Sequence, residues 1–391
     1  MKTHYLLFLY CSFLILCGCS TKKGETVPEI LIFDLTQKYP VKEIYLQDIA
    51  EVSYIPLETR DDMLWKGPVS GLGEDLILNV EAMKGDILLF DGRGKAIRHI
   101  KRQGGSAEEY SGIISVVCDE QQKELFVKSN SMKKILVYDL EGNYKRTLAF
   151  IPERIYRSFA ILDANHLIAF SKEHEAGLNN NFFILSKEDG RLVKALTIPA
   201  EKEIPEILMQ TDANNNTSIA TIASYPITPT SNGLFVQDLS SDTIFSFDPA
   251  TLSLHPAIVR TPSIHVMESE IFLYTLIDSP GYTYFMTMER ANHNTQHSGY
   301  PRKYYIHDKK KGEIYEALIA NKDHPASGHS LILSGQRSKM SPGTNGIGFK
   351  TLDPMELLDA YESNQLQGRL KEIAKELDEE DNPVIMVAKF R

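Results

Sequence analysis

The chain has 391 residues, of which 42% are hydrophobic, so it is long enough to bury a large core. Its 42 Lys and Arg residues stand against 52 Asp and Glu residues, which gives a formal net charge of −10 at pH 7. Because binding to nucleic acids requires a basic surface that contacts phosphates, this balance argues against DNA and RNA as partners.

The N-terminal segment has the layout of a secretory signal peptide. Lys2 supplies a positive charge, and residues 5–16 are almost wholly apolar. This apolar run of about twelve residues is shorter than the ~20 that span a bilayer, which favours a signal over an anchor helix. Its ending, Leu-Cys-Gly-Cys19, is similar to a bacterial lipobox, and this similarity implies that Cys19 is lipidated and becomes the mature N-terminus.

These features predict three segments along the chain. Residues 1–18 form a lipoprotein signal peptide, residues 19–29 a polar lipidated tether, and residues 30–391 a single globular domain. We therefore expect a protein of the cell envelope that is anchored by its N-terminal lipid, with the outer membrane as the favoured location. Whether it faces the periplasm or the cell surface is left open.

A strand-and-turn phrase recurs five times within the globular region. Each copy is an apolar run that ends at a short polar residue, namely Asp91, Asp139, Ser186, Asp248 or Asp308. A turn containing Gly follows each copy except the fourth, where Pro249 takes that place. Repeats of about 40 to 50 residues that consist of strands are typical of propeller blades, and the wider spacing of the later copies indicates insertions.

The predicted fold is therefore all-β, a six-bladed β-propeller in one domain. We expect about four strands in each blade. The predicted blades cover residues 69–103, 112–152, 158–199, 218–262, 271–319 and 327–391.

The last predicted blade contains a short helical insertion. Asp353, Pro354 and Glu356 have the residue types of a helix start, with an N-cap acid, a proline in the first turn and a glutamate at the third position. Leu370 and Ile373 have helical spacing and predict a second helix on the flank of the propeller.

Two strand-like runs near the ends of the chain have no complete blade of their own. They are residues 52–55 and residues 384–388. We expect them to share the last sheet and to close the ring, because closure removes open sheet edges that would otherwise pair with other chains.

Several segments carry a family resemblance. Residues 48–59, with the run Ile-Pro-Leu-Glu-Thr, residues 90–95 and residues 100–110 resemble the six-bladed β-propeller lipoproteins of Bacteroides-type bacteria, which are related to NHL-repeat propellers. The C-terminal residues 379–387 are similar as well. Where that family usually has Gly-Pro-Gly-Glu-Tyr, this chain has Ser-Ala-Glu-Glu-Tyr at residues 106–110, so the family's tight loop is not expected. The resemblance implies a fold and a compartment, but no activity.

Three histidines are the leading candidates for a catalytic metal site. His293, His297 and His307 could converge on a divalent metal at the propeller channel, as in the lyase or hydrolase chemistry of some NHL-type propellers. Residues 291–301 contain Asn, Gly and Pro and are typical of a loop, so solvated loop histidines are the favoured alternative. No cofactor is predicted, and a divalent metal belongs to this second hypothesis.

The repeated aspartates have two possible roles. Asp139, Asp248 and Asp308 could form a ring of carboxylates along the channel. The favoured interpretation is that each accepts hydrogen bonds from the backbone of its own turn, and Asp91 is interpreted in the same way.

Three residues are candidates for binding. Trp65, the only tryptophan, lies in a predicted loop, where it could stack on a sugar ring or a partner, or cover the bottom of the ring. Arg102 belongs to a basic group that includes Arg98 and Lys101 and could lie near Trp65. Tyr300 is equally open to a binding or a packing role.

The favoured function is a non-enzymatic binding platform in the cell envelope. Propeller loops would recognise a glycan, a peptide or an envelope protein, and the protein is expected to be a monomer. The alternative is a metal-assisted lyase or hydrolase with its site at the channel mouth, and a third possibility is a scaffold without a ligand of its own. The sequence contains no Gly-x-Ser-x-Gly motif that would indicate a hydrolase nucleophile.

Overall fold

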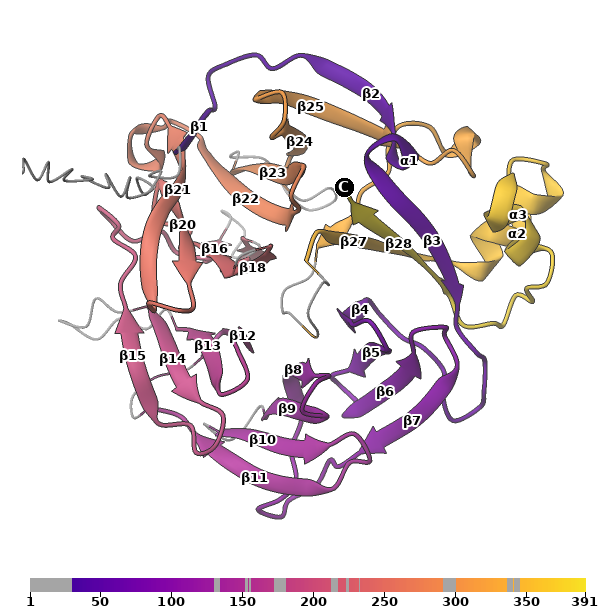
Figure 1. Ribbon diagram of the computed structural model, residues 1–391, viewed down its shortest axis with the longest axis horizontal. Helices are drawn as coiled ribbons and strands as arrows, with labels where there is room; N and C mark the ends of the chain where they lie inside the picture. The colour runs from indigo at the N-terminus through magenta and orange to yellow at the C-terminus, as the bar shows by residue number, and fades with distance from the viewer. Residues whose placement is uncertain are drawn as a thin grey trace, which may run out of the picture.

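Six β-sheets form a ring around a central axis in the computed structural model of this protein (Figure 1). The structure describes residues 30–129, 134–151, 154, 156–171, 181–211, 217–222, 225–231, 233–290, 300–335, 340 and 345–391, and for residues 207–211 and 217–221 it describes the backbone alone. This arrangement confirms the predicted six-bladed β-propeller.

Blades 1 to 3 are regular sheets of four antiparallel strands. Blade 1 consists of β4 (Val69–Leu72), β5 (Leu76–Glu81), β6 (Asp86–Asp91) and β7 (Ala96–Lys101). Blade 2 consists of β8 (Ile113–Asp119), β9 (Glu124–Ser129), β10 (Lys134–Asp139) and β11 (Tyr144–Ala149). Blade 3 consists of β12 (Ser158–Ile161), β13 (His166–Phe170), β14 (Phe182–Ser186) and β15 (Leu192–Leu196). The first strand of each blade lies nearest the axis and the last strand lies at the rim (Figure 1).

Blades 4 and 5 each have a fifth strand from the N-terminal part of the chain. Blade 4 consists of β18 (Ile227–Thr230), β19 (Gly233–Val236), β20 (Thr243–Asp248) and β21 (Ser253–Thr261), and β1 (Leu31–Asp34) pairs in parallel with β21. Blade 5 consists of β22 (Glu270–Asp278), β23 (Tyr282–Arg290), β24 (Arg302–Asp308) and β25 (Glu313–Ala320), and β2 (Val41–Tyr45) pairs in parallel with β25.

Blade 6 joins the two ends of the chain, as the sequence predicted. It consists of β26 (Ser334–Gly335), β27 (Ile347–Leu352), β28 (Val384–Phe390) and β3 (Ala50–Pro56). The register sets Tyr54 opposite Met386 and Ala50 opposite Phe390. Residues 31–56 thus supply the outermost strand of three successive blades, and we call them the N-terminal strap.

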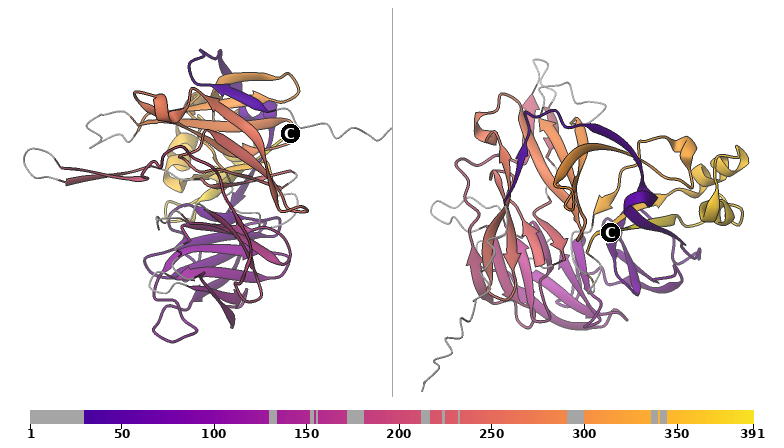
Figure 2. Two further views of the ribbon diagram at one scale, coloured as in Figure 1. Left: turned by 90° about the vertical axis from the view of Figure 1, so that its left-hand side faces the viewer. Right: turned by 45° about the horizontal axis from the view of Figure 1, so that its top comes forward.

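The predicted start of the fourth blade was wrong. Residues 218–221, which the sequence assigned to that blade, belong to β17 (Thr217–Thr221), which pairs with β16 (Ile207–Thr211) in a separate two-stranded sheet. This hairpin projects away from the ring (Figure 2). A strand in an insertion has the same local pattern as a strand in a blade, so periodicity alone did not separate them.

The helices confirm the expected C-terminal insertion. The Asp353 carboxylate accepts hydrogen bonds from the backbone N–H groups of Met355 and Glu356 and caps α2 (Pro354–Glu362). α3 (Gly368–Ala374) follows, and both lie outside the ring (Figure 1). The remaining short helices are α1 (Leu46–Ile49), η1 (Ile264–Val266) and η2 (Pro325–Ser327). None of the helices within the described ranges is long and apolar enough to span a bilayer.

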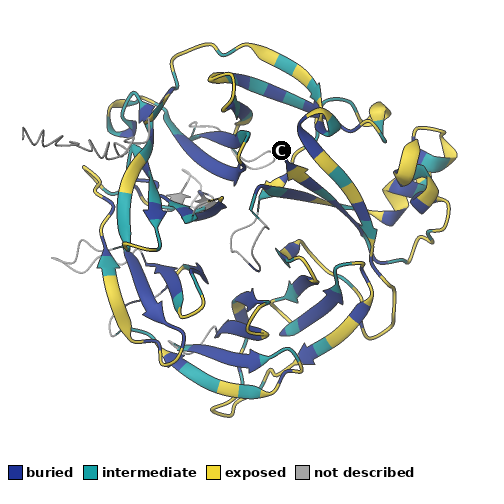
Figure 3. Cartoon of the chain, in the orientation of Figure 1, coloured by how far each residue is buried: buried dark blue, intermediate teal, exposed yellow. Residues whose placement is uncertain are grey.

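The inner strands of the blades are mostly buried (Figure 3), and their side chains form the core between neighbouring blades. In β9, Leu125 and Val127 pack toward blade 1, while Phe126 packs toward blade 3. Successive side chains of a strand point to opposite faces, so a run of apolar residues fills two blade interfaces at once. This explains why the apolar runs of the repeat are continuous rather than alternating.

The repeated aspartates stabilise their own turns, as expected. The Asp139 carboxylate accepts hydrogen bonds from the backbone N–H groups of Glu141 at 2.9 Å and Asn143 at 2.8 Å. Asp91 accepts the equivalent bonds from Arg93 and Lys95. Asp248 and Asp308 also accept from their own turns, which confirms the turn interpretation.

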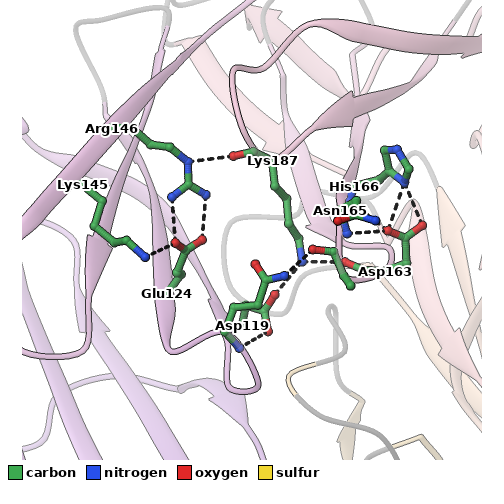
Figure 4. Close-up of polar contacts among 10 residues, drawn as sticks. Asp119, Glu124, Lys145, Arg146, Asp163, Asn165, His166 and Lys187 are labelled. Atoms are coloured by element: carbon green, nitrogen blue, oxygen red, sulfur yellow. Dashed lines mark hydrogen bonds and ion pairs between the residues drawn. The ribbon is translucent and has the colours of Figure 1, made fainter.

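A buried polar network joins blades 2 and 3 (Figure 4). The Lys187 ammonium lies 2.5 Å from a carboxylate oxygen of Asp119, and both side chains are almost fully buried. The Arg146 guanidinium binds both carboxylate oxygens of Glu124 at 2.7 Å and donates to the Lys187 carbonyl at 2.9 Å. Lys145 also pairs with Glu124. Every charge in this network therefore has an opposite partner.

Candidate functional site

A cavity of about 550 Å³ occupies the centre of the ring. All six blades contribute to its lining, through Gly71, Val116, Phe159, Ile227, Leu276 and Ser334 of their first strands. The volume lies within the range of small-molecule binding sites, roughly 300 to 1,000 Å³. The residues that precede these strands lie at one end of the cavity, which we call the mouth, and the turns that follow the strands lie at the other end, which we call the floor.

The floor is apolar and covered. Met340, in the connection between β26 and β27, is buried, and its carbonyl accepts a hydrogen bond from the Glu120 N–H at 3.1 Å. Its sulfur lies so close to Gly71 that a Cβ atom at this position would approach it to 2.5 Å. Glycine at residue 71 therefore leaves room for the Met340 side chain, which lines the cavity and packs among buried residues of blades 1 and 2.

The mouth carries two arginines. Arg157 directly precedes β12, and Arg302 is the first residue of β24. A guanidinium nitrogen of Arg157 lies 3.5 Å from a carboxylate oxygen of Glu206. Within the described part of the chain Arg302 has no carboxylate at ion-pair distance, and the lining of the cavity includes no Asp or Glu.

Tyrosines form the wall beside these arginines. The Tyr225 ring packs edge-on against the Tyr274 ring at 5.4 Å, and the Tyr304 ring stacks on Tyr284 at 5.8 Å. Burial raises the pKa of Tyr274 and of Tyr304, so both hydroxyls stay protonated at neutral pH. The buried Tyr274 hydroxyl has no hydrogen-bond partner among the described residues. Tyr225 and Tyr304 line the cavity, so the wall offers their aromatic rings and hydroxyl groups, with Tyr274 and Tyr284 packed behind them.

A buried lysine lies beside Arg157. The Lys128 side chain is only 3% exposed, and its ammonium donates to the Tyr156 carbonyl. Burial, and then the positive charge of Arg157, lower the pKa of Lys128 to about 8. At neutral pH this part of the mouth therefore holds more positive than negative charge.

The family follows from a comparison with known sequences. The chain matches the family described as "Domain of unknown function (DUF4934)" over residues 30–389. It belongs to the DUF4934 family. No curated protein sequence matches this DUF4934 chain.

A solved structure from Bacteroides fragilis supports the fold of this DUF4934 chain. A crystal structure from Bacteroides fragilis NCTC 9343, of a protein named as an exported one, aligns with a TM-score of 0.65 and 14% identity and covers 93% of this chain and 100% of that chain. A member of the duf4221 family from Bacteroides vulgatus ATCC 8482 aligns with a TM-score of 0.48 and 9% identity over 88% of this chain and 97% of that chain. At these identities the likeness concerns the fold alone.

The three binding candidates predicted from sequence are not among the residues that line the cavity of the DUF4934 chain. The Trp65 ring packs on Phe90 at 5.9 Å, and its indole N–H donates to the Gly67 carbonyl at 2.7 Å. The Arg102 guanidinium donates to the Gly142 carbonyl at 2.8 Å, which links blades 1 and 2. Tyr300 is half-buried against the core. Their binding roles stay predictions.

The basic group around Arg102 is paired with acids. His99 and Lys101 both contact the Asp86 carboxylate, at 2.9 and 3.1 Å, and Arg98 pairs with Glu141. These contacts link strands and blades of the DUF4934 fold rather than forming an open basic patch.

Of the three histidines predicted as metal ligands, the structure describes His307 alone. His293 and His297 lie outside the described residues, as does the predicted lipidation site Cys19. His307 lies near the end of β24 remote from Arg302, in register with Thr283, and burial, together with the nearby Lys309, lowers its pKa. The described ranges contain no cluster of three or more potential metal ligands. A metal site of the DUF4934 chain stays a prediction.

Sequence reasoning missed Arg157, Tyr225 and Arg302. They come from blades 3, 4 and 5 and form no motif, because only ring closure brings them to one mouth. The available signal was their position in the chain. Arg157 directly precedes β12, and Tyr225 closely precedes β18, so each lies before the first strand of its blade.

Proposed function

We propose that this protein is a non-enzymatic binding protein of the cell envelope that holds its ligand in the central cavity. The supporting observation is a cavity of about 550 Å³ to which all six blades contribute, with two arginines at its mouth and the buried Met340 at its floor. Such a cavity encloses a small molecule, or the end of a glycan or peptide, on a rigid scaffold.

The chemistry of the described lining favours recognition over catalysis. Its ionisable side chains are Arg157, Arg302, Cys118 and tyrosines. Burial raises the pKa of the Cys118 thiol, which keeps it protonated and unreactive. General acid–base catalysis uses a group whose pKa lies near the working pH, whereas a guanidinium stays charged there and burial raises the pKa of Tyr304.

The location is inferred from two sources. The signal-like residues 1–18 and Cys19 support export and lipid anchoring, and the similar structure from Bacteroides fragilis is named as an exported protein. The binding protein would thus be held at a membrane surface, with the outer membrane as the proposed site, and would present its mouth to a glycan, a peptide or another envelope component.

The test is a substitution that fills the mouth. Ile332 lines the cavity and is 49% exposed, so Ile332→Trp adds bulk at the mouth without requiring the core to expand. Ile97 on β7 is 45% exposed at the rim of the ring, so Ile97→Trp is the matched control.

The full-length protein and both variants are screened by thermal shift against oligosaccharides, peptides and small metabolites. A ligand at a hundred times its Kd stabilises a protein by about 2.7 kcal/mol, which is a shift of a few degrees for a domain of this size. We expect hits that persist in Ile97→Trp and vanish in Ile332→Trp. Hits that survive Ile332→Trp would place the ligand elsewhere and overturn the proposal.

A further inference from the structure

Polarity changes along the length of the cavity. The arginines and tyrosines lie at the mouth, together with the exposed Ile114 and Ile332, whereas the lining contributed by Leu78, Leu276, Met340 and Phe349 is buried and carries no charged group. A ligand that fills the cavity would therefore meet charged and hydroxyl groups at one end and apolar side chains at the other.

The positive charge at the mouth is unusual for this chain. Acidic side chains outnumber basic ones by 52 to 42 over the whole sequence, yet the described lining has two arginines and no carboxylate. Local charge opposite in sign to the net charge attracts ions of the complementary sign into a cleft, because low-dielectric walls focus the field.

We propose that the ligand is an amphiphilic anion, with an oxyanion such as a carboxylate at Arg302 and Arg157 and an apolar body that extends toward Met340. This inference rests on the proposed function, because it names the chemistry of the ligand held in the same cavity.

Arg302 is the principal anion contact. Its guanidinium has no ion pair among the described residues, whereas Arg157 shares its charge with Glu206 at 3.5 Å. A guanidinium presents five N–H donors in a planar fork and binds a carboxylate through two parallel hydrogen bonds. The Arg157 side chain is 46% exposed, and Lys128 beside it adds positive charge.

The aromatic wall suits the junction between the two parts of such a ligand. The Tyr225 and Tyr304 side chains both line the cavity and are half-buried. Tyrosine places an apolar ring next to a hydroxyl group, so it contacts the apolar body with one part and polar atoms of the ligand with the other.

The experiment compares probes that differ in one property. Decanoate carries the anion and the chain, decan-1-ol carries the chain alone, and acetate carries the anion alone. Binding to the full-length protein is measured by calorimetry below the micelle concentration. We expect decanoate to bind at least tenfold more tightly than decan-1-ol and acetate not to bind.

Variants then identify the contacts. Arg302→Gln should weaken decanoate binding by about 10- to 100-fold, the range for a lost charge-assisted hydrogen bond, and leave decan-1-ol unchanged. Arg302→Lys keeps the charge without the planar fork, so its affinity for decanoate should lie between those of the parent protein and Arg302→Gln. Arg369→Gln on α3, whose side chain is exposed far from the mouth, is the control and should match the parent protein.

The outcomes separate this inference from the proposed function. Equal affinity for decanoate and decan-1-ol, or no effect of Arg302→Gln on decanoate binding, would overturn the proposal that the ligand is an anion. Binding of an anionic sugar such as glucuronate without binding of decanoate would overturn the proposal that the ligand has an apolar body. In either case, a neutral hit abolished by Ile332→Trp would leave the proposed function standing. If Ile332→Trp abolishes no hit at all, the proposed function fails as well.

Discussion

Two buried lysines at opposite ends of the interface between blades 2 and 3 have different partners. Near the floor, Lys187 is 3% exposed and its ammonium contacts the Asp119 carboxylate and the Asp163 carbonyl, each at 2.5 Å (Figure 4). Near the mouth, Lys128 is also 3% exposed, but its described partner is the neutral Tyr156 carbonyl and its charged neighbour is Arg157.

The comparison indicates different roles for the two ends. A buried charge is costly unless it is paired and hydrogen-bonded, and the end near the floor meets this condition with Asp119. The end near the mouth concentrates cations instead, which costs stability and leaves positive charge available for a ligand. We interpret the first arrangement as structural and the second as functional.

The largest effect is expected from breaking the floor pair. Asp119→Ala leaves the Lys187 ammonium buried without its carboxylate, so the free energy of unfolding should fall by about 3 to 5 kcal/mol. Urea denaturation followed by circular dichroism measures this change. Binding at the mouth should be unaffected at temperatures where the variant is folded.

The double variant Asp119→Leu with Lys187→Met is the control for that prediction. Apolar residues of similar volume often replace a buried ion pair with little loss, so the double variant should be more stable than Asp119→Ala. If Asp119→Ala were as stable as the parent protein, the structural role of the pair would be refuted.

A smaller effect on the free energy of unfolding, which depends on pH, is expected from Lys128 near the mouth. The pKa of Lys128 is about 8 in the folded protein, below the ordinary 10.5 of an exposed lysine. Between these two values the unfolded chain binds more protons than the folded one, so this lysine makes stability rise with pH by at most about 1.4 kcal/mol per unit. Below pH 8 both states are protonated and the full cost of burying the charge is present.

Lys128→Met should remove this rise. Denaturation curves of the parent protein and the variant at pH 7.5, 9 and 10 test it, with Lys375→Met, at an exposed lysine that directly follows α3, as the matched control. Parallel pH profiles for the parent protein and Lys128→Met would contradict the prediction.

The smallest effect is expected at a repeated turn. Asp139→Ala removes the acceptor of two backbone hydrogen bonds and should cost about 1 kcal/mol. The exposed Glu141→Ala in the same turn removes only a surface ion pair and should cost less than about 0.5 kcal/mol. Equal losses in thermal denaturation would show that the Asp139 turn bonds contribute nothing specific.

The sequence predicted those parts of the fold that depend on local patterns. The turn at Asp139 is encoded within five residues, and the cap at Asp353 within four, so both were recognisable. Closure by residues 52–55 and 384–388 was predictable because two strands lacked partners and an open propeller edge is unfavourable.

Long-range features could not be predicted in the same way. The strands β1 and β2 pair in parallel with strands more than half the chain away, and no local pattern states which blade receives them. The pair Lys187 and Asp119 and the cavity residues Arg157 and Arg302 likewise come from different blades. Single-sequence reasoning favoured Trp65 instead, because an isolated aromatic in a loop is conspicuous whether or not it contacts a ligand.

The N-terminal strap has a mechanical consequence for an anchored protein. If Cys19 carries the membrane anchor, as proposed, any force on the tether reaches β1 first, then β2, and only then β3. β1 and β2 are additional fifth strands of blades 4 and 5, whereas β3 completes blade 6 and closes the ring. The first two strands would therefore have to separate from β21 and β25 before the load reached the pairing of Ala50 with Phe390, which closes the ring around the central cavity.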